Sequence, residues 1–71
     1  MGLTGVVMTP AEYARVLRNA FYWEVDNGGR QRAHALGAEL KALYQSEPGN
    51  PWVCQCWAQV ESDSVIRMIR L

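Results

Sequence analysis

The segment Thr9-Pro10-Ala11-Glu12 constrains the fold of this chain more than any other part of the sequence. Thr is favoured at a helix N-cap, Pro at the first helical position, and Glu at the third position completes a capping box. Apolar residues then recur at intervals of three and four: Tyr13, Val16, Leu17, Ala20 and Phe21. The pattern predicts a helix over residues 10–26 with one apolar stripe facing a core, and Gly28 suits the C′ position after it.

A second apolar stripe predicts a helix over residues 30–45, and good helix formers fill most of its other positions. Its members are Ala33, Leu36, Leu40, Leu43 and Tyr44. Gly37 interrupts the stripe at a cost of about 1 kcal/mol relative to Ala. On the buried side, this Gly would let another helix approach closely. Because only a short Asn-Gly-Gly link separates the two segments, we expect an antiparallel helical hairpin.

The last part of the chain allows two interpretations. As a helix, it begins with Asn50 as the cap and Pro51 at the first position, and its apolar face includes Val53 and Val60. As a strand, it shows apolar residues at the even positions 52–60 and is rich in Trp, Val and Cys. Residues 65–71 are equally open, as a helix or as a strand pairing back across a turn at residues 62–64.

The helical phase shifts between these two segments, which predicts that no unbroken helix runs through both. The Asn-Pro start favours helices. The expected fold is therefore all-α, a small helical domain built on the N-terminal helical hairpin. The alternative is α+β, with the helical hairpin followed by a C-terminal β-hairpin.

Length and charge limit the class of protein. A chain of 71 residues forms one domain, in which residues 1–8 are either a flexible arm or a short strand. With 49% apolar and 10% aromatic residues, it is not a disordered tail. A net charge of zero argues against a general nucleic-acid binder and against an acidic DNA mimic. No apolar run approaches the ~20 residues of a membrane span, so we expect a soluble, cytoplasmic protein.

The sequence offers little for catalysis or metal binding. Cys54 and Cys56 would point to opposite sides of a helix, and on a strand they would still lack further zinc ligands. His34 is the only histidine, and it lies beside the apolar stripe of the second helix. The carboxylates are dispersed, and no nucleophile is paired with a base. We expect no enzyme activity, no cofactor and no metal.

Aromatic and arginine side chains point instead to partner binding. Phe21, Tyr22 and Trp23 are consecutive, so a helix cannot bury all three in one small core and Tyr22 or Trp23 must lie at an edge. Trp, Tyr and Arg are enriched in binding hot spots. The candidate contact residues are Tyr22, Trp23, Arg30, Arg32, Trp52, Trp57, Arg67 and Arg70.

The sequence favours a small non-enzymatic protein-binding module, an adaptor or inhibitor of prokaryotic, phage or mobile-element type that occupies a surface of another protein. We expect a homodimer with Trp23 at or near the contact. The alternative is a small DNA-binding regulator that uses Arg30, Gln31 and Arg32 at the start of the second helix. Because Glu39 and Glu47 follow and the chain as a whole is not basic, nucleic-acid binding is the weaker hypothesis.

Overall fold

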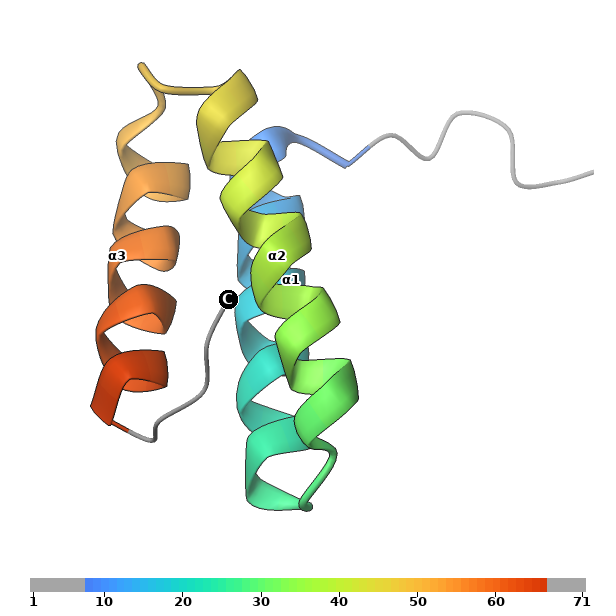
Figure 1. Cartoon of the computed structure of the whole chain (residues 1–71). Coiled ribbons are helices and arrows are strands. Elements are labelled where there is room, and N and C mark those ends of the chain that lie inside the picture. Colours follow the sequence, from blue (N-terminus) through green and yellow to red (C-terminus); the bar gives the residue numbers. More distant parts are fainter. Residues whose placement is uncertain (1–7, 67–71) are drawn as a thin grey trace, which may run out of the picture.

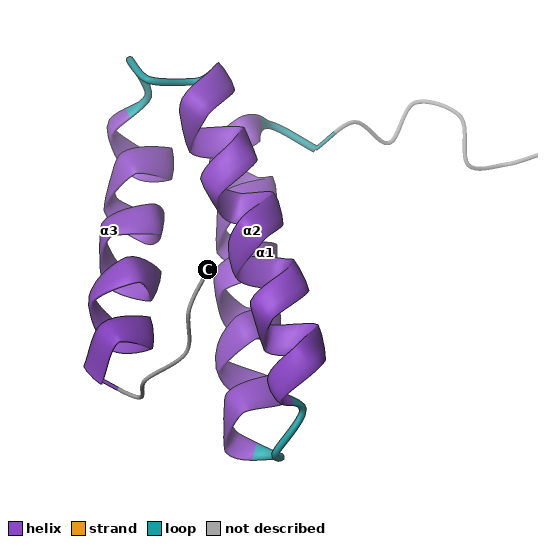
Figure 2. Cartoon of the chain, in the orientation of Figure 1, coloured by secondary structure: helices purple, strands orange, loops and turns teal. Residues whose placement is uncertain are grey.

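Three helices joined by two short loops make up residues 8–66, the part of the chain that the computed structural model describes (Figure 1). They are α1 (Pro10–Asp26), α2 (Arg30–Ser46) and α3 (Pro51–Ile66). The predicted all-α fold is confirmed, and the α+β alternative is wrong, because residues 51–66 are helical (Figure 2). Within residues 8–66, no helix is both long and apolar enough to span a membrane. The arm or strand expected at the N-terminus lies almost wholly outside the described residues.

Helix α1 begins at the predicted capping box. The Thr9 hydroxyl accepts a hydrogen bond from the Glu12 backbone N–H at 3.2 Å, and the Glu12 carboxylate accepts one from the Thr9 N–H at 2.9 Å. At the other end, Asn27 is the C-cap and Gly28 takes φ +79°, the left-handed conformation that suits glycine. The bounds of α1 and the C′ role of Gly28 are confirmed.

The buried face of α1 is narrower than the predicted stripe. Ala14, Leu17 and Phe21 are buried, whereas Val16 is 48% exposed and Ala20 is only half-buried. Residues three and four apart share a helix face, and those that adjoin Leu17 and Phe21 in sequence are turned about 100° away. Val16 and Ala20 therefore lie beside the core rather than in it.

Helix α2 runs antiparallel to α1 (Figure 1), as the short Asn-Gly-Gly link predicts. The Gly29 N–H donates to the Glu24 carbonyl at 2.7 Å and closes the turn between them. Further along the pair, the Tyr13 hydroxyl donates to the Glu39 carboxylate. Gly37 is buried, as expected from its place in the stripe.

Helix α3 is capped by Asn50, whose side-chain oxygen accepts from the backbone N–H groups of Trp52 at 3.0 Å and Val53 at 3.3 Å. The helix then continues without a break to Ile66. The prediction that no single helix crosses residues 62–64 is therefore wrong. The buried position in that region is Ser64, whose hydroxyl donates to the Glu61 carbonyl at 2.8 Å.

The core lies where the three helices meet, and each helix packs against both others. Its members are Ala14, Leu17, Phe21, Ala33, Leu40, Val53, Cys56, Trp57 and Val60. Tyr44 stacks on Trp57 with ring centroids 6.4 Å apart and joins α2 to α3. The Tyr22 hydroxyl joins α1 to α3 by donating to the Asp63 carboxylate, and it lies 3.3 Å from the Gln59 carbonyl.

Candidate protein-binding surfaces

The predicted contact residues separate by exposure. Trp23 and Trp52 are 61% and 64% exposed, and Arg30 and Arg32 also lie in solvent. Arg67 and Arg70 lie outside the described residues.

Two of the candidates belong mainly to the packing of the helices. Trp57 is only 7% exposed and stacks on Tyr44, so its side chain is part of the core and not of a contact surface. Tyr22 is half-buried, and its hydroxyl is engaged with Asp63. Trp52 and Trp57 are five residues apart, about 140° around a helix, so one faces solvent while the other faces the core.

Trp23 belongs to an exposed apolar stripe on α1. Val16, Ala20 and Trp23 are spaced by four and three residues, so they follow one another along the same side of the helix. We call these three residues the α1 outer face. No described helix covers it, since Val16 is half exposed and Trp23 more so.

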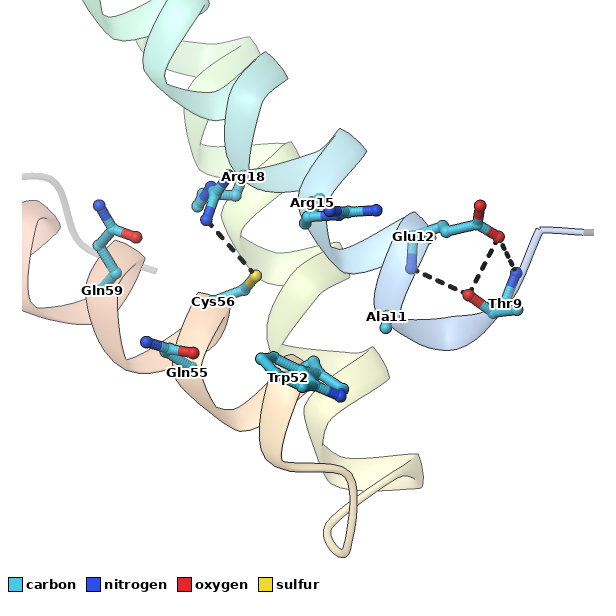
Figure 3. A pocket seen from close by; sticks show the side chains of 9 residues that line it. All are labelled: Thr9, Ala11, Glu12, Arg15, Arg18, Trp52, Gln55, Cys56 and Gln59. Carbon is cyan, nitrogen blue, oxygen red and sulfur yellow. Dashed lines mark hydrogen bonds between the residues drawn. The ribbon is translucent and has the colours of Figure 1, made fainter.

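A groove of about 490 Å³ lies between α1 and α3 (Figure 3). Helix α1 supplies Arg15 and Arg18 to one wall, and α3 supplies Trp52 and Gln55 to the other. Cys56 lies at the floor and is buried. The remaining lining residues are Thr9, Ala11, Glu12 and Gln59.

Of these lining residues, the sequence analysis found only Trp52. The spacing of Arg15 and Arg18, three residues apart, indicates a shared helix face. It does not indicate that α3 would lie parallel to α1 on that side, as it does in Figure 1. The groove follows from tertiary packing, which a local pattern does not specify.

The two arginines of the groove have only weak partners. An Arg18 guanidinium nitrogen lies 3.9 Å from the Cys56 sulfur, and two others donate to the side-chain oxygen of the neighbouring Asn19 at 3.2 and 3.3 Å. Across residues 8–66, no carboxylate forms an ion pair with Arg15 or Arg18.

Glu12 supplies the one negative charge in the lining of the groove. The backbone N–H of Thr9, and then the Thr9 hydroxyl, lower the pKa of Glu12, and the charge of Arg15 adds a smaller effect in the same direction. The carboxylate is thus ionised at neutral pH and engaged by the helix cap. Two arginines and one glutamate leave the groove with a net positive charge.

The cysteines and the histidine hold ordinary positions. The Cys54 thiol donates to the Pro48 carbonyl at 3.4 Å, and both cysteines are free. His34 is exposed on α2. The described residues contain no cluster of His, Cys, Asp or Glu side chains that could hold a metal ion.

Arg30 and Arg32 lie at the start of α2 beside a shallow hollow of about 310 Å³, lined by residues 28–32. Gly29 forms the N-cap there, without a side-chain hydrogen bond. Both arginines extend from one helix end into solvent, so nothing opposite them forms a second wall.

Comparison with known proteins gives no relative: no family model, no curated protein and no solved structure matches this chain.

Proposed function

We propose that the protein is a small non-enzymatic binding module, an adaptor or inhibitor that acts by occupying a surface of another protein. The observation that carries the proposal is the exposure of Trp23 and Trp52, each more than half accessible to solvent. Trp is the residue type most enriched in binding hot spots, and large exposed apolar surface on a small protein is typical of contact sites.

Self-association through the α1 outer face is part of this proposal. A single core of this size provides roughly 3–5 kcal/mol of stability, so a second copy that covers Trp23 and Val16 would add to it. A two-fold axis is the commonest way for a protein to pair with itself, and it brings the same patch together from both copies. The groove lies on a different side of α1, so a homodimer of this kind leaves it open.

We place the protein in the cytoplasm of a prokaryotic cell, as a cellular, phage or mobile-element product. The two free cysteines support a reducing compartment, since cytosolic thiols are kept reduced. Cys56 serves the core, where it acts as a small apolar residue.

A DNA-binding regulator is the second candidate, supported by the exposure of Arg30, Gln31 and Arg32 at the start of α2. It has less support, because α1 and α2 form an antiparallel hairpin (Figure 1), whereas a helix-turn-helix crosses at about 90–120°. The net charge of zero also gives little attraction for phosphates.

A gel-shift assay with duplex DNA at low and high salt separates the two candidates. We expect negligible binding by the parent chain and by the Arg30→Ala/Arg32→Ala variant. Tight binding by the parent that falls steeply with salt, and is lost in the variant, would favour the DNA-binding regulator.

Affinity isolation from the native host tests the binding function itself. The tagged chain is compared with its Trp23→Ala and Trp52→Ala variants, and with His34→Ala as a control on the exposed side of α2. We expect a protein retained in stoichiometric amount by the parent and the control, and depleted by at least one Trp variant. Identical recovery with all four proteins would contradict the proposal.

A further inference from the structure

We propose that the groove between α1 and α3 binds an acidic segment of another protein. Arg15 and Arg18 hold a carboxylate side chain, and Trp52 packs against an apolar side chain near it. This inference rests on the proposed function as a binding module, and it adds the chemistry of the ligand.

The arginines provide the first step of the argument. Arg15 and Arg18 are three residues apart on α1, so they extend from the same side of the helix into the groove (Figure 3). A guanidinium group matches a carboxylate with two parallel hydrogen bonds, which makes such pairs strong and directional. Arg18 now donates only to a sulfur atom at 3.9 Å and to the Asn19 amide, and a carboxylate would replace both partners at little cost.

The opposite wall suits the rest of a peptide. Trp52, Gln55 and Gln59 are spaced by three and four residues, so they follow one another along one side of α3. The Trp52 ring is 64% exposed and offers a flat apolar surface. The two glutamine amides can donate to and accept from the backbone of an extended chain. The volume of about 490 Å³ lies within the range of about 300–1,000 Å³ that binding pockets occupy.

The groove favours a separate acidic protein over the other possible occupants. Residues 1–7 (MGLTGVV) and 67–71 (RMIRL) of this chain contain no Asp or Glu, so neither segment carries the required side chain. A nucleic-acid strand needs cations along its whole path. Here the lining offers two arginines, and Glu12 at one end would repel a second phosphate.

Selection from a random-peptide display library on the immobilised full chain tests the ligand chemistry. We expect the selected peptides to be enriched in Asp or Glu next to an apolar or aromatic residue. Duplex DNA, added as a competitor, should not displace them. Selected peptides without acidic enrichment, displacement by duplex DNA, or failure to select any peptide would each overturn the proposal.

Matched arginine variants then locate the binding site. For the tightest selected peptide, Arg15→Gln/Arg18→Gln should weaken binding by roughly tenfold or more, because charge-assisted hydrogen bonds are lost. Arg30→Gln/Arg32→Gln removes the same charge elsewhere on the surface and should leave the affinity unchanged. Trp52→Ala should weaken binding and Trp23→Ala should not. Equal effects of the two arginine pairs would overturn the assignment to the groove.

A charge exchange guards against loss of the fold. The Arg15→Glu/Arg18→Glu variant should lose the acidic peptide and gain a peptide in which the acidic residue is replaced by Lys; gain for the exchanged pair shows that the variant is folded. Failure of that gain, with a helical circular dichroism spectrum retained, would contradict the proposal. Peptides that bind elsewhere would leave the proposed function standing, whereas a partner that ignores Trp23 and Trp52 would contradict that function alone.

Discussion

Thr9 and Glu12 show how two neighbouring side chains start a helix. Each satisfies a backbone N–H of the other that the first turn of α1 leaves without a helical partner. All of this chemistry lies within four residues, so the sequence was sufficient to predict it. The same holds for Gly28, whose positive φ ends the helix. Replacing Thr9 with Ala should cost about 1 kcal/mol of stability, measured by thermal unfolding.

Acid should weaken this cap. The folded pKa of Glu12 lies below its ordinary value of 4.5 because the backbone N–H and hydroxyl of Thr9 bond to the ionised form. The charged carboxylate therefore stabilises the fold above the unfolded pKa, and this contribution is lost as the pH falls through the folded pKa.

The Glu12→Gln variant tests that pH dependence. We expect it to melt below the parent at neutral pH, with the difference shrinking as the pH falls through the acid range. Thermal unfolding of both proteins across the pH series measures it. A difference that stays constant at every pH would show that the ionised carboxylate makes no contribution.

At the scale of the element, α3 shows what the sequence did not reveal. Val53, Trp57, Val60 and Ser64 are spaced by four, three and four residues and all face the core. A serine in the last of these positions hides the continuity of the stripe. The apolar residues beside it, Val65 and Ile66, are 72% and 73% exposed. The apparent change of phase came from polar and apolar side chains that had exchanged their usual places.

A proline at position 62 tests the continuity of α3. Ser62 is exposed, so its substitution acts mainly through the backbone. Ser62→Pro should cost about 3 kcal/mol, because it removes a helical hydrogen bond and its ring clashes with the preceding turn. Ser62→Ala is the control and should unfold with the parent. If the proline variant were as stable as the control, residues 62–64 would be a turn rather than part of a helix.

The whole molecule depends on contacts between helices, and these decide which side chains remain outside. Trp57 stacks on Tyr44 of α2, while Trp52, one and a half turns earlier, lies at the groove. The two residues are alike as isolated sequence features. The same limit applies to Arg15 and Arg18, which become a pair of groove residues only because α3 packs beside them.

Substitution of the two tryptophans should separate their roles. Trp57→Ala removes a buried ring at a cost of about 3–5 kcal/mol, which matches the whole stability of a core this size, so we expect an unfolded chain. Trp52→Ala should leave the circular dichroism spectrum and the melting temperature nearly unchanged. Similar melting temperatures for the two variants would contradict the assignment of Trp57 to the core.

Sedimentation equilibrium over a concentration series tests most directly the claim that the α1 outer face is a contact surface. We predict an apparent mass that rises from 8.0 kDa towards twice that value at micromolar concentration. Trp23→Ala should weaken the dimer, and Trp52→Ala should leave it intact because the groove lies on another side of α1. A mass fixed near 8.0 kDa at every concentration, or a dimer indifferent to Trp23→Ala, would contradict the account.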